Sequence, residues 1–475
     1  MRTTTRRGFL RWAGAGLLGA GAMLRAAAGA ASAPKRPNIV FILIDDLGWA
    51  DLGCYGSTYH RSPIVDRLAA QGMRFTDAYA ACPVCSPTRV SILTGKYPAR
   101  VGVTDFIPGH YRPFAKLTVP TIHNQLPLEE TTIPEALKRA GYVSACFGKW
   151  HLGGGQQFGP KAQGFDVADG GNNRQRDKMV ENLTDLAVGF IEENRDKPFF
   201  LYLSHNSVHI ALEAPPELVD AAKKRLKPGQ EHPRQANPTY AAMIEHLDKH
   251  VGRVLDKLDE LKLAERTMVV FYSDNGGLIR IYTGQGEIVT SNLPARSEKG
   301  TLYEGGIRVP LIVRWPGVVR PGSVSHEVVT STDFFPTFVE LAGLRPQPGE
   351  GTDGVSLMPV LKGGRLDRDA IYWHYPHYHH CAPCAAVRAG NYKLIEYFED
   401  GKLELYDLSK DLGEKHDLSA DLPAKAAELQ TQLAAWRNQV GALMPTSNPN
   451  HDPTRAPEWG RRPRPGAKTP KKAKK

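Results

Sequence analysis

The stretch Asn38-Ile39-Val40-Phe41-Ile42-Leu43-Ile44, which runs directly into Asp45 and Asp46, decides the fold. All but the first of its residues are apolar, and most of these are β-branched. A continuous apolar run of this length predicts a strand buried on both faces, whereas a strand with one wet face would alternate. Such strands occur in parallel sheets that helices cover on both sides. The stretch therefore predicts the interior of an α/β domain, with two acidic residues where a strand ends.

The rest of the chain up to about residue 345 shows the same alternation. Helix-like patterns and β-rich runs follow one another, which predicts a large mixed, mostly parallel sheet flanked by helices. The predicted helices cover residues 64–71, 132–140, 182–194 and 240–261, and the predicted strands cover residues 142–147, 199–204, 267–273 and 310–314.

The pattern changes after residue 345. Short strands are predicted at residues 386–388, 392–397 and 402–407, and a helix at residues 422–440. Strands and helices in separate runs are typical of an α+β unit. We therefore expect a catalytic domain over residues 34–345, a C-terminal α+β subdomain over residues 346–445 and a flexible basic tail over residues 446–475.

The composition of the 475 residues is that of a globular protein, with 41% hydrophobic and 23% charged residues. The net charge of +10 comes from the two ends of the chain. Residues 1–33 carry five Arg and no acid, and residues 446–475 carry nine Lys and Arg against two acids. The body of the chain is therefore close to neutral, which argues against a nucleic-acid partner.

The N-terminal segment is typical of an export signal. Arg6-Arg7 precedes an apolar run rich in Gly and Ala over residues 12–24, and small residues at 28–33 offer cleavage sites. This order predicts a signal peptide over residues 1–33, of the bacterial twin-arginine type. The alternative, an anchor helix, is disfavoured because the run is too short and rich in Gly to span about 30 Å of hydrocarbon. We expect a periplasmic or secreted protein without a stable membrane span.

Polar residues follow several of the predicted strands. Asp45-Asp46, Gly148–His151, His205 to His209, and Asp274-Asn275 all come directly after a buried run. Ligands bind at the carboxyl ends of the strands in sheets of this kind. We therefore expect these four segments to form one composite site.

Two of these segments suit a metal ion. Adjacent acids such as Asp45 and Asp46 repel each other unless a cation neutralises them. With Asp274 and Asn275 they offer four oxygen ligands, which suit Ca²⁺ and, less well, Mg²⁺. One acid of each pair could instead cap a helix. The presence of two such pairs favours the metal.

The most specific motif is Cys85-Ser86-Pro87-Thr88-Arg89, followed by Leu93-Thr94-Gly95. Cys82 and Cys85 have the spacing of a redox pair, but Pro87 and Arg89 do not suit such a motif. The stretch resembles the signature of the sulfatase family, in which the Cys is oxidised to formylglycine by a maturation enzyme. The resemblance extends from residue 36 to about residue 440 and implies the fold of the sulfatase and alkaline phosphatase superfamily.

The resemblance implies a role for each residue that matches the family pattern. The modified Cys85 is expected to bind calcium together with Asp45, Asp46, Asp274 and Asn275. The other implied roles are that Arg89 holds the formylglycine, Lys149 and Lys299 grip the sulfate, His151 acts as a base, and His209 acts as an acid toward the leaving oxygen. The chain departs from the family pattern at Val208, where Pro is common.

The implied chemistry explains why a plain hydroxyl would not serve. A sulfate ester is anionic and its sulfate leaves slowly, so hydrolysis needs charge neutralisation and a covalent partner. A hydrated aldehyde at residue 85 offers one hydroxyl to attack sulfur and a second to release the sulfate. A serine lacks that second hydroxyl.

Residues 373–384 are rich in aromatic residues and His and end in Cys381-Ala382-Pro383-Cys384. The segment is either a solvated loop, a disulfide or metal staple made by the two Cys residues, or a pocket rim that binds a sugar. Residues 373–376 and 388–395 resemble bacterial sulfatases that act on galactose or N-acetylgalactosamine sulfates. His374 and His377, together with His205, are therefore candidate substrate contacts.

Three functions compete. The first is an exo-acting carbohydrate sulfatase. The second is a phosphodiester or phosphonate monoester hydrolase of the same superfamily, and the third is a non-catalytic protein that binds sulfated glycans and leaves Cys85 unmodified. The two Lys residues favour a sulfate grip, and a binding protein would need no acid for a leaving group. We therefore expect the first function.

Overall fold

The computed structural model describes residues 36–226, 235–281, 286–347 and 350–460. The predicted signal peptide lies outside the described residues. The described residues from Arg36 to Gly460 belong to a single compact unit. Its centre is an eight-stranded sheet, which consists, in spatial order, of β10 (Ser323–Ser325), β2 (Met73–Phe75), β9 (Leu311–Arg314), β8 (Thr267–Ser273), β1 (Asn38–Ile44), β7 (Phe199–Ser204), β5 (Val143–Gly148) and β6 (Val167–Asp169). Only β9 runs antiparallel to its neighbours, β8 and β2, so the expected mixed, mostly parallel sheet is confirmed.

The strand β1 lies near the middle of the sheet and is buried along its whole length. It pairs in parallel with β8 on one side, from Asn38–Thr267 to Ile44–Ser273, and with β7 on the other. Residues 39, 41 and 43 pack into one hydrophobic cluster, and residues 40, 42 and 44 pack into another on the opposite face. Burial of both faces explains why the sequence of this strand does not alternate.

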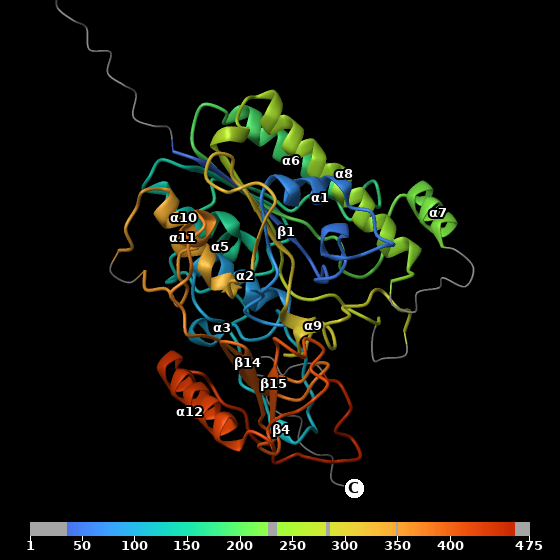
Figure 1. The fold of residues 1–475 in the computed structure, drawn as a ribbon, viewed down its shortest axis with the longest axis vertical. Coiled ribbons are helices and arrows are strands. Elements are labelled where there is room, and N and C mark those ends of the chain that lie inside the picture. Colours follow the sequence, from blue (N-terminus) through green and yellow to red (C-terminus); the bar gives the residue numbers. More distant parts are fainter. Residues whose placement is uncertain (1–35, 227–234, 282–285, 348–349, 461–475) are drawn as a thin grey trace, which may run out of the picture. The chain divides into compact units, whose positions relative to one another are not determined.

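Helices cover both faces of the sheet, and β1 lies between the two groups in Figure 1. The helices on one face are α1 (Pro63–Gln71), α6 (Val180–Glu193) and α8 (Pro238–Glu260). The helices on the other face are α2 (Cys85–Thr94), α4 (Ile133–Lys138), α10 (Phe334–Leu341) and α11 (Met358–Leu361). The other α-helices that precede the small C-terminal sheet in the chain are α3 (Pro98–Val101), α5 (Gly155–Phe158), α7 (Pro216–Arg225) and α9 (Glu304–Ile307).

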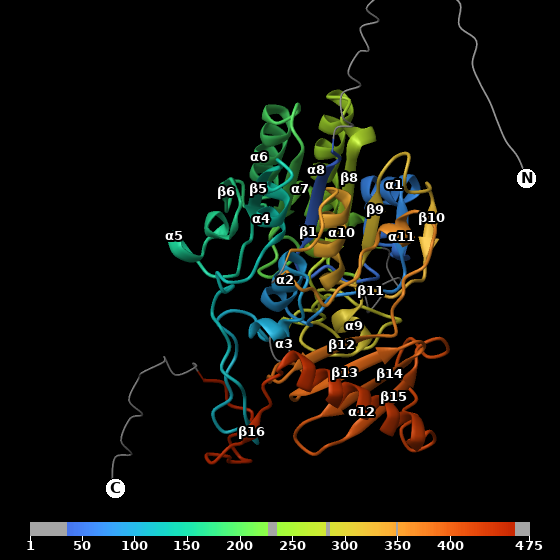
Figure 2. The ribbon, with the colours of Figure 1, turned by 90° about the vertical axis from the view of Figure 1, so that its left-hand side faces the viewer.

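A smaller antiparallel sheet follows in the chain and lies at one end of the unit in Figures 1 and 2. Its strands, in spatial order, are β12 (Ala370–Tyr375), β13 (Cys384–Ala389), β14 (Tyr392–Tyr397) and β15 (Leu403–Asp407). The helix α12 (Pro423–Val440) covers one face through Leu429, Leu433 and Trp436. Burial of each of the two Leu side chains stabilises the packing by about 1.5–3 kcal/mol.

Two expectations about this C-terminal part need correction. Residues 370–375 form the edge strand β12, although we expected the aromatic segment that begins at residue 373 to be a loop or rim. The chain also stays folded beyond residue 446, because β16 (Thr446–Ser447) pairs with β4 (Leu117–Thr118). The Asn448 side chain donates hydrogen bonds to the carbonyls of Pro113 and Ala115. A flexible tail therefore does not begin at residue 446, and residues 461–475 lie outside the described part.

The boundary expected at residue 345 does not separate two cores. One hydrophobic cluster joins Tyr79 and Ile307 to Trp373, Ile395 and Tyr406 of the small sheet. A short two-stranded sheet, β3 (Ala78–Tyr79) with β11 (Val329–Thr330), lies in the connecting region. The small sheet is thus packed onto the large one as part of the same unit.

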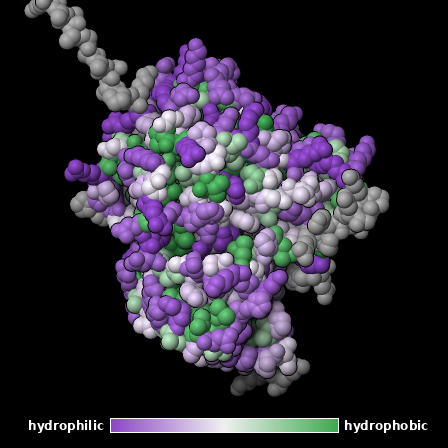
Figure 3. Space-filling model, in the orientation of Figure 1, coloured by the Kyte–Doolittle hydropathy of each residue, from purple (hydrophilic) through white to green (hydrophobic). Residues whose placement is uncertain are grey.

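The surface carries a mixture of polar and apolar side chains. On the face in Figure 3, hydrophilic residues predominate and apolar residues occur in small groups. Within the described ranges, none of the helices combines the length and the apolar character needed to cross a bilayer.

Candidate active site

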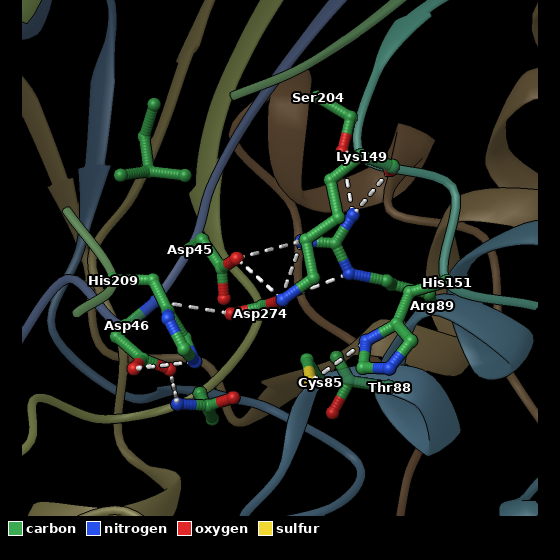
Figure 4. A network of polar contacts seen from close by, with 12 residues as sticks. Asp45, Asp46, Cys85, Thr88, Arg89, Lys149, His151, Ser204, His209 and Asp274 are labelled. Atoms are coloured by element: carbon green, nitrogen blue, oxygen red, sulfur yellow. Dashed lines mark hydrogen bonds and ion pairs between the residues drawn. The ribbon is translucent and has the colours of Figure 1, made fainter. Parts of the chain in front are cut away.

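Three buried acids meet where β1 and β8 end (Figure 4). Asp45 and Asp46 follow β1, and Asp274 follows the parallel neighbour β8. The Asp46 amide donates a hydrogen bond of 3.2 Å to Oδ1 of Asp274. Asp46 has a φ of 64°, a left-handed value that Asp tolerates better than most residues. The register of two parallel strands thus brings together acids that are more than two hundred residues apart in sequence.

These acids fit a hard divalent cation. Ligand atoms of Asp45, Cys85 and Asp274 all lie within 4.8 Å of one another, as do those of Asp45, Asp46 and His209. Oδ1 of Asp45 and Oδ1 of Asn275 are buried and have no hydrogen-bond partner within the protein. Orphaned buried oxygens of this kind are costly unless something binds them, and oxygen donors are what Ca²⁺ prefers.

The charges of the acids depend on their neighbours. Burial opposes the charge of Asp45, but Lys149, His209, Arg89 and Lys299 together hold the pKa of its carboxyl below the usual range. Burial and the nearby Asp45 carboxylate raise the pKa of Asp274 instead. A bound cation would favour the charged form of all these carboxylates.

Cys85 is the first residue of α2 and is buried. Its Sγ lies 3.3 Å from Nδ1 of His151. Ser86 fixes the same region, because its hydroxyl donates to the His151 carbonyl at 2.9 Å and accepts from the Ile107 amide. Burial raises the pKa of the Cys85 thiol, so an unmodified Cys85 would be a poor nucleophile at neutral pH.

Arg89 lies one turn further along α2 and is fully buried. Its Nε and Nη2 donate to Oδ2 of Asp274 at 3.0 and 2.7 Å. Its Nη1 donates to the Lys149 carbonyl at 2.7 Å and to the Ser204 hydroxyl at 2.6 Å. Arg89 therefore ties the helix that carries Cys85 to the ends of β5, β7 and β8.

Two Lys side chains reach the acids from separate loops. Nζ of Lys149, after β5, lies 2.5 Å from Oδ2 of Asp45, and Nζ of Lys299 lies 2.8 Å from Oδ2 of Asp46. Burial lowers the pKa of both ammonium groups, but the carboxylates outweigh it and both values are raised. Both Lys side chains are therefore charged at neutral pH.

Gly148 allows Lys149 to leave β5 at this point. Its φ is 98°, and a Cβ there would lie 2.0 Å from the Ser204 carbonyl oxygen. A side chain at residue 148 would thus force β5 away from β7.

The two His residues of the predicted machinery lie on opposite sides of the acids. His151 has a φ of 57°, and its Nε2 lies 2.6 Å from the Ile107 carbonyl. Burial, and then Lys149, lower the pKa of His151 to about 4, so the ring is neutral and its Nδ1 lone pair faces residue 85. Nε2 of His209 lies 3.7 Å from Oδ2 of Asp46, and its Nδ1 contacts the Ile210 carbonyl. Burial lowers the pKa of His209 as well.

The chain around Val208 is held firmly despite the departure from the family pattern. The Asp45 amide donates to the Ser207 carbonyl at 2.9 Å, and the Val208 amide donates to the Asp45 carbonyl at 2.7 Å. These two bonds tie the loop after β7 to the end of β1 and place His209 beside Asp46.

A cavity of about 310 Å³ opens above these residues. Its floor is charged or nucleophilic, and part of its wall is apolar. The lining residues are Cys85, Lys149, His151, His209 and Lys299 together with Phe106, Ile107, His110, Ile210, Leu278, His379 and His380.

The comparisons with known proteins agree with this geometry. The sequence matches the family described as Sulfatase over residues 37–344. The chain belongs to the sulfatase family. A second family, described as N-sulphoglucosamine sulphohydrolase, C-terminal, matches residues 297–440. The predicted family and its activity, sulfate ester hydrolysis, are thus confirmed.

Individual relatives cover most of this sulfatase. It is 34% identical to a sulfatase of Formosa agariphila, over 85% of this chain and 89% of the relative. It is 37% identical to the N-acetylgalactosamine-6-sulfatase of Homo sapiens, over 73% of this chain and 70% of the relative. The crystal structure of Ps i-CgsB in complex with k-i-k-neocarrahexaose matches with a TM-score of 0.72 and 27% identity, over 88% of this chain and 96% of that one.

The three His residues predicted to touch the substrate of this sulfatase do not line the cavity. His205 is buried behind the end of β7, and its Nδ1 has no hydrogen-bond partner within the protein. His374 is buried with its Nε2 3.0 Å from the Leu443 carbonyl, and His377 is buried with its Nε2 2.7 Å from the Thr104 hydroxyl. Their assignment as substrate contacts is therefore wrong in this structure.

Three other His residues line the cavity instead, and only two of them lie in a segment that the sequence singled out. His379 and His380 belong to the aromatic segment that the sequence singled out, but the chain must reverse after β12 before a His can face the cavity. His110 comes from the loop between α3 and β4, where no motif marks it.

Proposed function

We propose that this sulfatase removes sulfate from a sulfated carbohydrate, with calcium bound by Asp45, Asp46, Asp274 and Asn275 and with formylglycine made from Cys85. The observation that carries the proposal is the position of Cys85. Its Sγ shares one group of close ligand atoms with Asp45 and Asp274, and it lines the floor of the same cavity as both Lys residues and both His residues.

Calcium and formylglycine would supply the positive charge and the nucleophile. Calcium, when bound, would stabilise negative charge on oxygens near residue 85 and lower the pKa of a hydroxyl there. Formylglycine would supply a hydrated aldehyde in place of the thiol of Cys85. The buried, protonated thiol of the unmodified chain offers no comparable nucleophile.

The residues of the chain orient the sulfate and move protons. The ammonium groups of Lys149 and Lys299 face the cavity and donate to the sulfate oxygens, whose charge they partly neutralise. Nδ1 of the neutral His151 accepts a proton from the group at residue 85. His209 lies across the acids from His151 and, in its imidazolium form, gives the Nε2 proton to the leaving oxygen of the sugar. Arg89 positions α2 and Asp274 rather than the substrate.

The cavity wall supports a sugar as the leaving group. Phe106, Ile210 and Leu278 offer apolar faces, and the His rings offer stacking surfaces with polar edges. The volume of about 310 Å³ is at the lower end of the range for ligand pockets and suits one terminal sugar, which favours exo action. The relative named N-acetylgalactosamine-6-sulfatase supports a galactose or N-acetylgalactosamine sulfate as the substrate class, and the similar structure in complex with k-i-k-neocarrahexaose supports a carbohydrate.

We also infer bacterial twin-arginine export, which carries proteins already folded. Cys85 is buried in the folded chain, so a maturation enzyme would reach it before folding, in the cytoplasm. Export of the folded protein to the periplasm or beyond would follow.

A substrate panel tests the proposed function. Enzyme whose residue 85 is confirmed by mass as formylglycine is assayed on sulfated galactose and N-acetylgalactosamine, on their oligosaccharides, on an aryl sulfate, and on aryl phosphodiesters and phosphonate monoesters. We expect the highest kcat/KM on a sulfated sugar.

A higher value on the phosphodiester or phosphonate would overturn the proposal in favour of the second candidate function. Binding of sulfated glycans without turnover by the modified protein would favour the third.

A further inference from the structure

Cys381 and Cys384 have no role in the chemistry described so far. Their Sγ atoms are 3.9 Å apart, and both thiols are free. Cys381 is half-buried, whereas Cys384 is buried as the first residue of β13. A disulfide needs its sulfurs at about 2.05 Å, so side-chain rotation over a short distance would be enough to form one.

The segment that carries Cys381 forms part of the catalytic cavity. His379 and His380 line the cavity, and Nδ1 of His380 lies 2.9 Å from the Lys299 carbonyl. The thiol of Cys381 donates to the Gly300 carbonyl at 3.2 Å.

The contact with residue 300 leaves no space for a side chain. Gly300 has a φ of 81°, and a Cβ there would lie 2.0 Å from Nδ1 of His379. The backbone of Lys299 and Gly300 is thus in direct contact with this segment.

The two Cys residues are anchored in different ways. Cys384 is paired within the small sheet, opposite Tyr375 and Tyr397, and the Pro383 carbonyl accepts from the Phe398 amide at 2.9 Å. Cys381 belongs to the loop and is held through Gly300. A bond between them would tie the cavity wall to the rigid sheet.

We propose that Cys381 and Cys384 form a disulfide in the mature protein and that this bond holds the wall segment 376–383 against Lys299. The effect of this bond on catalysis rests on the role proposed for Lys299. Formation of the bond does not depend on that role. A metal staple is less well supported, because neither Cys belongs to a group of three close metal-ligating side chains among the described residues.

The oxidant is a second disulfide, such as oxidised glutathione. The thiolate of Cys381, the more exposed of the two, attacks one sulfur of the oxidant and releases one thiol. The thiolate of Cys384 then attacks the Cys381 sulfur of the mixed disulfide and releases the second thiol. Two protein S–H bonds are exchanged for one S–S bond, and the oxidant is reduced to two thiols.

Peptide mapping tests the bond. Trypsin releases residues 369–388 as one peptide that contains both Cys residues, because no Lys or Arg lies between Arg368 and Arg388. Full-length protein purified after export, and protein incubated with oxidised glutathione, are alkylated while denatured and before any reduction. We expect this peptide without alkyl groups and lighter by two hydrogens. Alkylation at both Cys residues, or a zinc ion that is lost in Cys381→Ser, would overturn the proposed bond.

Reduction tests the effect on the cavity without a mutation. A phosphine reductant should lower kcat/KM of the oxidised enzyme on an aryl sulfate by roughly three- to thirtyfold, because small displacements of positioned groups have large effects on rate. Little change is expected in the unfolding temperature, since the closed loop is very short. The Cys381→Ser and Cys384→Ser variants should resemble the reduced enzyme and no longer respond to the reductant.

The matched control is Cys54→Ser, which removes the other half-buried thiol and should leave the response unchanged. A disulfide whose reduction leaves kcat/KM the same would contradict the link to Lys299. If turnover is absent even in oxidised, correctly modified enzyme, the proposed function fails, and the mapping result still decides the bond.

Discussion

Nδ1 of His151 lies 3.3 Å from Sγ of Cys85, while Nε2 of the same ring lies 2.6 Å from the Ile107 carbonyl. The carbonyl can only accept, so Nε2 carries the proton and Nδ1 offers its lone pair to residue 85. A neutral His with a fixed tautomer beside the residue to be modified is the arrangement that a base needs.

The first prediction concerns residue 85 itself. Cys85→Ala removes the thiol from which the aldehyde is made, so we expect kcat to fall by about a thousandfold or more. Initial rates on an aryl sulfate measure the loss. Cys82→Ala, which removes the neighbouring buried thiol, should keep most of the activity and serves as the control. Comparable activity in Cys85→Ala and the unmutated enzyme would refute the role of formylglycine.

The second prediction concerns calcium. Asp45→Asn keeps the shape of the side chain but removes a charge from the proposed metal site. At a calcium concentration of about one hundred times Kd, bound metal should stabilise the unmutated protein by about 2.7 kcal/mol, and the variant should lose most of this gain. Thermal unfolding with calcium and with a chelator gives the comparison. The exposed acid variant Asp256→Asn should behave like the unmutated protein, and an equal calcium effect in Asp45→Asn would count against the site.

The third prediction concerns the sulfate grip. Lys149→Met and Lys299→Met keep the length of the side chain but remove an ammonium group that faces the cavity. Each should lower kcat by about a hundred- to a thousandfold, because the lost group stabilises charge that develops in the transition state. Steady-state kinetics at saturating calcium separate this loss from weaker metal binding. The exposed Lys161→Met is the control. A rise in KM alone would mean that these Lys residues only bind the substrate.

The fourth prediction concerns stability and pH. Asp248 accepts hydrogen bonds from the Ile64 and Val65 amides at 3.0 and 2.8 Å and so caps α1. Burial is the main cause that raises the pKa of its carboxyl from 3.8 to about 6. The folded state therefore binds this proton more tightly than the unfolded state, and the free energy of unfolding falls as the pH rises from about 4 to about 6.

Asp248→Asn removes this titration. Relative to the unmutated protein, the variant should gain about 2 kcal/mol in the free energy of unfolding between about pH 4 and pH 7. Urea unfolding of both proteins at the two pH values measures the change. A difference between the proteins that stays constant with pH would mean that the carboxyl has an ordinary pKa.

The sequence predicts most of the large sheet because its strands are buried on both faces and leave continuous apolar runs, as in residues 38–44. The same reasoning does not predict the strand β12. Its residues 373–375 combine Trp, His and Tyr at the edge of a small sheet, a composition that also suits a pocket rim.

The sequence likewise predicts some residues of the site and not others. The motif at Cys85–Arg89 and the acids after β1 and β8 can be predicted because they follow the sheet or a specific signature. The bonds from Arg89 to Asp274 join residues 185 positions apart and are visible only in the folded chain. Likewise, His374 is buried within β12 beside the Leu443 carbonyl, and His377 is buried beside Thr104. The reversal of the chain after Tyr375 brings His379 and His380 to the cavity instead.

The mass of residue 85 is the most direct test of the central claim. Trypsin releases Phe75–Arg89 as one peptide, and its mass can be measured on active enzyme made in cells that contain the maturation enzyme. We predict an aldehyde at residue 85 and a thiol at Cys82. Active enzyme that retains a thiol at residue 85 would contradict the account.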